Sequence, residues 1–205
     1  MITGSEMGHG FPTAKFFRIV NEQTGVCLFA ASGGRTYVDE SNLAGGVSYS
    51  HTNDQHLAVG PVKGTRGEVW FFDDRNRRSF DEAWCLVNAN KDIRTAYTLH
   101  AGPRDESTIT YGHDDLGLIG WGQKGQTQWE AGDGRIWPEP RRDKFITVLR
   151  DGHKHRVGLA DRADDNQVWT FQEVELPGES VPTERLGIYS QSPPGTDLSK
   201  WRTRM

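Results

Sequence analysis

The sequence predicts an all-β domain with pseudo-threefold internal symmetry, on two observations. First, three tryptophan-centred segments recur in the same setting, each after a loop rich in glycine and polar residues: Glu68–Phe72, Thr127–Ala131 and Gln167–Phe171. Their tryptophans are 59 and 40 residues apart, and repeats of this length imply units that cannot each close a core alone. Second, short segments rich in β-branched and aromatic residues alternate with Gly, Asn, Asp and Pro, which is typical of a sandwich or barrel.

The first two strands are expected at Phe16–Val20 and Val26–Phe29. The segment Asn21–Gly25 between them has turn composition, and Gly25 can supply the positive φ that a hairpin turn requires. Further strands are expected at Trp84–Val87, Arg135–Trp137 and Phe145–Leu149. No segment has the periodicity of an amphipathic helix.

The chain is expected to be one domain with a tail at each end. Residues 1–14 show no periodic pattern and are expected to be a flexible N-terminal segment. The domain is expected over 15–176, with lobes at about 15–73, 74–132 and 133–176. Residues 177–205 form a Pro/Gly-rich tail that we expect to be extended.

Composition narrows the function classes. Only 35% of the 205 residues are apolar, yet the chain has seven Trp, nine Phe and five Tyr, which predicts a small aromatic core. A net charge of -4 argues against a nucleic-acid-binding face, and no apolar run is long enough to span a membrane.

Because the N-terminus lacks signal-peptide features, we expect a cytoplasmic protein. Cys27 and Cys85, which precede leucines at corresponding points of two repeats, should then stay unpaired.

The order of these elements carries a family resemblance. A strand, a Thr-Gly turn, a Cys-Leu step, a Gly-Leu step and a Gln-x-Trp element resemble the ricin B-type β-trefoil lectin-like family over about residues 15–175. The resemblance implies three four-stranded lobes around a threefold axis, with the Gln-x-Trp element (QxW) at the base of each. Only the third copy keeps the glutamine, Gln167, since Glu68 and Thr127 replace it. The tryptophan is present in all three copies, as expected of a packing residue.

The resemblance also implies where a sugar pocket would lie. In sugar-binding members an Asp follows the Cys-Leu-type step and an aromatic ring lies near the Gly-Leu-type strand, so that carboxylate and amide groups bind hydroxyls while the ring stacks on the sugar. At the Asp position this chain has Phe29, Val87 and Thr147 in its three repeats. In the third repeat, Ala160 stands where the ring would be. The carboxylate and the ring are therefore both replaced.

The third repeat does keep the amide pair that the family places before the tryptophan. Asn166 and Gln167 are the expected ligand-binding residues, with Asp165 beside them as a further acceptor. The alternative interpretation is structural, because a buried amide commonly caps a turn or ties down loop backbone.

Two long insertions distinguish the first two repeats from the third. From the Cys-Leu step to the tryptophan there are 43 residues in the first repeat and 44 in the second, against 23 from Ile146 in the third. The insertions match, since Tyr49-Ser50-His51 corresponds to Tyr111-Gly112-His113. Acidic residues follow, with Asp114 and Asp115 after the second histidine. Insertions of this length lie on the surface, where they can build a site on the rigid barrel.

These insertions allow three interpretations. A Tyr and a His two residues apart on an extended segment face the same side, so His51 with Tyr49, or His113 with Tyr111, has the groups for acid–base catalysis. The same groups, with Asp114 and Asp115, can hold a polar ligand without any chemistry. Alternatively, the tyrosines pack on the lobes and the histidines face solvent.

The first functional hypothesis is a non-catalytic module that binds a carbohydrate or another small polar ligand. Its main alternative is a cytoplasmic enzyme that acts on a specialised metabolite through the His/Tyr pairs, and a third is a protein-interaction or inhibitor protein whose long loops contact a partner. No cofactor or metal site is predicted. Asp151–His155 contains two imidazoles, but its Asp-Gly step and intervening Lys154 favour a solvated hairpin tip.

Overall fold

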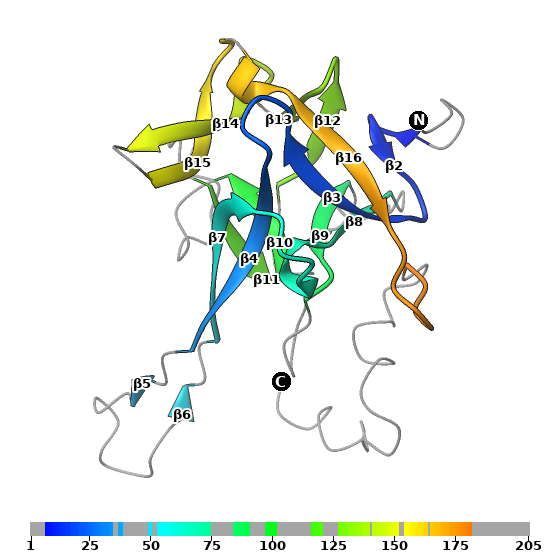
Figure 1. The fold of residues 1–205 in the computed structure, drawn as a ribbon, viewed down its shortest axis with the longest axis vertical. Helices are drawn as coiled ribbons and strands as arrows, with labels where there is room; N and C mark the ends of the chain where they lie inside the picture. The colour runs from blue at the N-terminus through cyan, green and yellow to red at the C-terminus, as the bar shows by residue number, and fades with distance from the viewer. Residues whose placement is uncertain are drawn as a thin grey trace.

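The computed structural model describes residues 7–34, 37–38, 49–50, 53–74, 84–90, 97–101, 116–120, 127–139, 141–151, 154–163 and 165–181. The N-terminal hairpin is β1 (Met7–Gly8) and β2 (Phe11–Pro12), and a short pair, β5 (Tyr37–Val38) and β6 (Tyr49–Ser50), extends beyond the first long hairpin (Figure 1). Within the described ranges, no helix has the length and apolar character needed to cross a bilayer.

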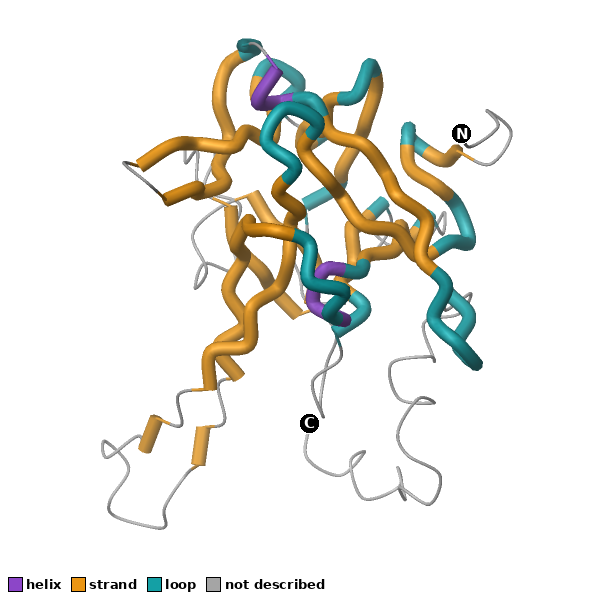
Figure 2. Tube along the Cα trace, in the orientation of Figure 1, coloured by secondary structure: helices purple, strands orange, loops and turns teal. Residues whose placement is uncertain are grey.

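The remaining strands fall into three groups of four. Lobe 1 contains β3 (Phe16–Asn21), β4 (Val26–Gly34), β7 (Asn53–Pro61) and β8 (Trp70–Asp73). Lobe 2 contains β9 (Cys85–Asn88), β10 (Tyr97–Ala101), β11 (Leu116–Gly120) and β12 (Trp129–Gly132). Lobe 3 contains β13 (Arg135–Pro138), β14 (Lys144–Asp151), β15 (Lys154–Asp161) and β16 (Trp169–Val174). Two 3-10 helices, η3 (Arg66–Glu68) and η4 (Asp165–Gln167), precede β8 and β16 (Figure 2).

Strand pairing follows the same rule in every lobe. The second and third strands form an antiparallel hairpin, as in β4–β7, β10–β11 and β14–β15. The fourth strand pairs with the first strand of the next lobe, as in β8–β9, β12–β13 and β16–β3, the last of which closes the chain back on its beginning (Figure 1). This arrangement is a β-trefoil, which confirms the expected fold class. All five strands expected from the sequence are present, and Gly25 has the positive φ, 68°, that the first turn requires.

One hydrogen bond repeats in all three lobes and explains why the tryptophan is kept. The indole Nε1 of Trp70, Trp129 or Trp169 donates to a carbonyl oxygen of the second strand of its own lobe at 2.9 Å, and the acceptors are Leu28, Leu99 and Ile146. Each indole is at most 2% exposed. A buried indole N–H needs an acceptor, so this bond fixes the base of each hairpin against the core.

The repeated bond also corrects the expected alignment of the two cysteines. Leu28 is equivalent to Leu99, not to Leu86, because Leu99 is the acceptor in lobe 2. Cys85 therefore lies on the first strand of lobe 2, whereas Cys27 lies on the second strand of lobe 1. Both strands contain a Cys-Leu step within a short continuous apolar run, and such a run cannot tell a first strand from a second.

The corrected alignment changes the length and position of the insertion expected in lobe 2. The separation between acceptor and tryptophan is 42, 30 and 23 residues in lobes 1, 2 and 3. Part of the extra length in lobe 2 therefore lies before β10. Cys27 and Cys85 are both buried and form no disulfide with each other. Burial, with the Glu68 carboxylate, raises the pKa of Cys27 to about 11.

The folded domain begins before residue 15. Phe11 is completely buried, with its ring centroid 4.6 Å from that of Phe72. The backbone N–H of Ala131 donates to the His9 carbonyl at 2.8 Å. Gly10 has a φ of +86°, and a Cβ there would lie 1.9 Å from the Ala131 carbonyl oxygen, so this close approach requires glycine. Residues 7–14, expected to be flexible, thus include a core residue and a specific contact with β12.

The domain also continues past residue 176. A second apolar cluster, here called the outer cluster, consists of Phe16, Val69, Phe71, Cys85, Val87 and Ala89. Leu176 and Val181 pack against it, while Glu179 forms an ion pair with Arg66. The segment 175–181 therefore covers an apolar surface of the strands that the core does not use.

Candidate ligand-binding site

Many of the sequence-predicted site residues lie outside the part of the chain that the structure describes: His51, His113, Tyr111, Asp114 and Asp115. Tyr49 is placed by its backbone in β6, opposite Val38, and Asp165 by its backbone in η4. The His/Tyr acid–base hypothesis therefore stays a prediction. Among the described residues, no group of three or more His, Cys, Asp or Glu side chains is arranged to hold a metal ion.

Gln167, one of the two expected amides, faces the interior. Its side chain is fully buried, and its Oε1 accepts the backbone N–H of Ala163 at 2.8 Å. Its Nε2 donates to Thr147 Oγ1 at 2.9 Å and to the Asp161 carbonyl at 2.7 Å. Both amide hydrogens are thus used inside the protein. This geometry is that of an anchor that ties the loop after β15 to β14.

The residues that replace the glutamine in the other lobes make the same kind of bond. Glu68 accepts the backbone N–H of Lys63 at 2.8 Å and of Gly64 at 2.9 Å. In lobe 2, Thr127 Oγ1 accepts the backbone N–H of Ala101 at 2.9 Å. Burial alone would raise the pKa of Glu68, but the hydrogen bonds from backbone N–H groups outweigh it, and the pKa is lowered. At all three positions, a side-chain oxygen accepts a hydrogen bond from a backbone N–H group of the preceding chain.

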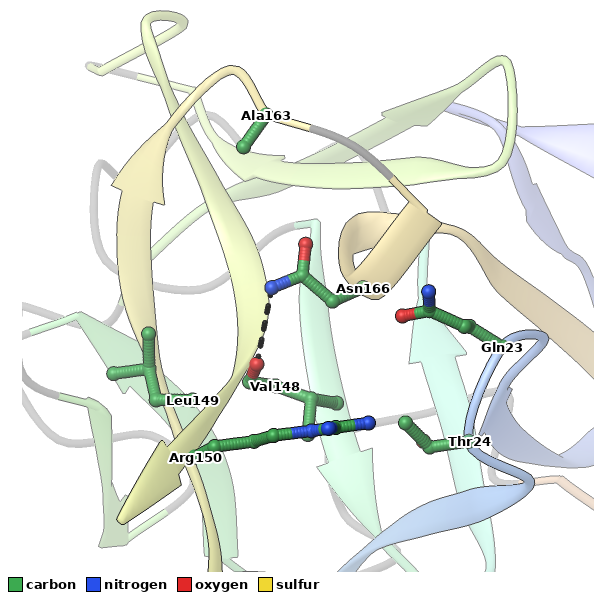
Figure 3. Close-up of a pocket in the computed structure, with 7 residues that line it drawn as sticks. All are labelled: Gln23, Thr24, Val148, Leu149, Arg150, Ala163 and Asn166. Carbon is green, nitrogen blue, oxygen red and sulfur yellow. Dashed lines mark hydrogen bonds between the residues drawn. The ribbon is translucent and has the colours of Figure 1, made fainter. Parts of the chain in front are cut away.

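Asn166, the other expected amide, borders an open cavity. Its side-chain Nδ2 donates to the Val148 carbonyl at 3.2 Å, and its side-chain oxygen, Oδ1, points away from that bond toward Ala163 (Figure 3). The cavity has a volume of about 460 Å³ and is lined by Gln23 and Thr24 of lobe 1 and by Val148, Leu149, Arg150, Ala163 and Asn166 of lobe 3. It therefore lies between the β14–β15 hairpin and the β3–β4 turn. We call it the lobe 3 pocket.

Polar side chains reach into the lobe 3 pocket from both lobes. The Gln23 amide faces Asn166 across the pocket, and the Arg150 side chain extends toward Thr24 (Figure 3). Val148 and Leu149 supply apolar surface between them. The lining residues that the structure describes include no Asp, Glu or His and no aromatic ring. They can therefore donate and accept hydrogen bonds, but they include no carboxylate–imidazole pair for proton transfer.

The family's Asp position gives no acceptor to this pocket. Thr147 Oγ1 donates to the Phe145 carbonyl at 2.8 Å and accepts from Gln167, so its hydroxyl is used. Arg150 and Gln23 were missed by the sequence reasoning. Gln23 belongs to a different lobe, and only the pairing of β16 with β3 brings its turn to Asn166. A motif read within one repeat cannot locate such a residue.

Lobe 1 has a counterpart cavity of about 370 Å³ with different chemistry. Gly67 stands at the position of Asn166, and a Cβ there would lie 2.5 Å from the Ala30 carbonyl oxygen, so no side chain fits without a shift. The lining includes the ring of Phe29 and the side chains of Arg66 and Asn90. Arg66 is already engaged, since its Nε donates to the Ala89 carbonyl and its guanidinium pairs with Glu179, which raises its pKa.

In lobe 2 the residue at the family's Asp position is His100, not Val87 as the sequence alignment had it. The register correction places His100 beside the indole acceptor Leu99, as Thr147 follows Ile146. His100 is 1% exposed, and its Nδ1 lies 3.1 Å from Thr127 Oγ1. Burial lowers its pKa, so the imidazole is neutral at pH 7. Its Nε2 has no hydrogen-bond partner among the described residues.

No protein-family model matches the chain, and no curated protein matches it significantly in sequence. The C-half of an earthworm R-type lectin in complex with GalNAc is similar in structure, with a TM-score of 0.49 and 12% identity over 78% of this chain and 99% of the other. A ricin B-like lectin of Macrolepiota procera in complex with lactose has a TM-score of 0.47 and 14% identity, over 79% of this chain and 97% of the other. The BEL beta-trefoil has a TM-score of 0.43 and 16% identity, over 80% of this chain and 96% of the other.

Proposed function

We propose that this protein is a non-catalytic β-trefoil binding module that takes a carbohydrate or another small polar ligand in the lobe 3 pocket. The observation that carries the proposal is the convergence of two amides, from Gln23 and Asn166, on one cavity of about 460 Å³. Small-molecule pockets commonly measure about 300–1,000 Å³ and combine apolar surface with a few polar groups. Amides both donate and accept hydrogen bonds, as does a sugar hydroxyl, so the two groups match each other.

Asn21 supports the proposal because it holds the two halves of the pocket together. Its Oδ1 accepts the backbone N–H of Thr24 at 3.0 Å and the Thr24 hydroxyl at 2.8 Å, which shapes the turn that carries Gln23. Its Nδ2 donates to the carbonyl oxygens of Asn166 at 3.1 Å and Val168 at 3.0 Å. The side chain is fully buried. A pocket fixed in this way before the ligand arrives loses less entropy on binding.

The test uses Gln23→Ala in the full chain. Gln23 is exposed and makes no hydrogen bond to another described residue, so this variant should fold normally. A glycan array identifies a binder, and titration calorimetry then measures its affinity. Loss of one ligand hydrogen bond should weaken binding by about two- to tenfold. The matched control is Gln172→Ala, which removes an exposed amide on β16 outside the pocket and should leave the affinity unchanged.

Two results would count against the proposal. Absence of binding to any array glycan or small polar metabolite at millimolar concentration would remove its basis. Binding that Gln23→Ala leaves unchanged would place the ligand elsewhere, with the inserted segments of lobes 1 and 2 as the next region to mutate. A ligand consumed during the titration would instead favour the enzyme alternative.

A further inference from the structure

We infer that the ligand of the lobe 3 pocket carries a negative charge, as a saccharide with a carboxylate or sulfate group does. The inference rests on the proposed function and specifies its ligand class. Of the seven described residues that line the pocket, Arg150 alone is charged, and its side chain extends across the pocket toward Thr24 (Figure 3). A guanidinium presents planar, paired N–H donors whose geometry matches a carboxylate or sulfate.

The charge of Arg150 is not neutralised by any described residue. Arg150 forms no ion pair or hydrogen bond within the described part of the chain. Its cross-strand neighbour on β15 is His155 rather than an acid. Asp161, at the far end of the same hairpin, pairs with Lys144 at 2.9 Å. This contrasts with Arg66 in the lobe 1 cavity, whose guanidinium already has a carboxylate partner in Glu179.

The other groups of the pocket favour an anion as well. The position where the family places a carboxylate has the Thr147 hydroxyl, which is consumed by two internal hydrogen bonds. The described lining residues therefore offer no carboxylate to a cationic ligand, while Gln23 and Asn166 remain for hydroxyl groups. The chain as a whole has a net charge of -4, so a general attraction of the protein for anions would not explain a preference at this pocket. Selectivity should accordingly depend on this one side chain.

The experiment compares pairs of sugars that differ in one acidic group. Calorimetric titrations of the full chain use methyl glucuronide against methyl glucoside, which differ in a carboxylate and a hydroxymethyl group, and sulfated against unsulfated N-acetylgalactosamine. The variants are Arg150→Gln, which removes the charge, and Arg150→Lys, which keeps it without the planar fork. Arg156→Gln is the matched control, because Arg156 is exposed on β15 and does not line the pocket. Thermal unfolding of each variant verifies that it is folded.

We expect at least one acidic sugar to bind about tenfold more tightly than its neutral counterpart, a preference that charge-assisted hydrogen bonds can supply. Arg150→Gln should abolish the preference, Arg150→Lys should retain part of it, and Arg156→Gln should leave it intact. Equal binding of acidic and neutral sugars, or a preference that survives Arg150→Gln, would overturn the inference and leave the proposed function standing. Failure of every one of these sugars to bind the parent protein would also overturn the inference, whereas the proposed function falls only if the glycan array and the small polar metabolites give no binding either.

Discussion

At the scale of single residues, three different side chains perform one structural task. Gln167, Glu68 and Thr127 each direct an oxygen at a backbone N–H of the preceding chain, at 2.8–2.9 Å. The glutamine position of the repeat is therefore an anchoring position. Its neighbour Asn166 is the residue that borders the pocket, so two adjacent amides in the sequence have separate roles.

Glu68 should make the stability of the protein depend on pH. Its folded-state pKa lies below the ordinary value of 4.5, so its contribution is present above pH 4.5 and is lost as the pH falls through the folded-state pKa. Glu68→Gln places an N–H₂ group against N–H donors and removes the charge that Arg18 Nε approaches at 3.3 Å. We expect it to lower the free energy of unfolding by about 1–3 kcal/mol at pH 7. The loss of stability caused by Glu68→Gln should be smaller at acidic pH, where the parent's carboxylate is protonated as well.

Urea denaturation of both proteins from pH 7 to pH 3 measures this effect. Glu173→Gln is the control, because the exposed Glu173–Lys15 pair should contribute less than about 1 kcal/mol. A Glu68→Gln variant whose stability follows that of the parent at every pH would show that the buried carboxylate does not titrate as proposed.

Sequence reasoning located the pocket only in part. Asn166 was identified because it keeps its place before Gln-x-Trp, whereas Arg150 and Gln23 belong to no motif and come together through strand pairing. The burial of Gln167 could be weighed but not decided, because a free amide and an internal anchor look alike in a sequence. Local motifs identified one wall of the pocket, and tertiary pairing supplied the other.

At the scale of elements, strand positions were predictable and strand equivalences were not. The segments Phe16–Asn21, Val26–Gly34 and Lys144–Asp151 all fall where short aliphatic and aromatic runs predicted strands. The strand predicted at Trp84–Val87 is also present, as Cys85–Asn88, but it was aligned with the wrong strand of lobe 1. Only the indole hydrogen bonds, formed between residues up to 42 positions apart, settle the register.

The C-terminal segment 175–181 should contribute to stability although the sequence places most of it in a tail. Leu176 and Val181 are partly buried against the outer cluster, so replacing both with alanine should lower the free energy of unfolding by about 1–3 kcal/mol, less than fully buried residues would cost. Urea denaturation measures the change. Glu175→Ala is the neighbouring exposed control and should have little effect. Unchanged stability in the double variant would mean that the outer cluster does not need this cover.

At the scale of the whole molecule, the threefold repeat of one hydrogen bond indicates that the lobes share one core. A single cluster includes Trp70, Trp129 and Trp169 together with residues of all three lobes. Since each lobe's fourth strand pairs with the first strand of the next, no lobe keeps its contacts when another unfolds. The molecule should therefore unfold in one cooperative step, unlike a linear repeat array.

Replacing each tryptophan in turn with phenylalanine tests whether the three lobes are equivalent and unfold together. Every variant loses the indole N–H, leaves the carbonyl of Leu28, Leu99 or Ile146 without its buried donor, and opens a small cavity. We expect each to lose about 2–4 kcal/mol of unfolding free energy, with values for the three lobes close to one another. Denaturation should remain a single transition whether followed by fluorescence or by circular dichroism. A variant that splits the transition in two would show that its lobe folds separately, and the threefold geometry would then describe three neighbouring units around a common axis instead of one cooperative domain.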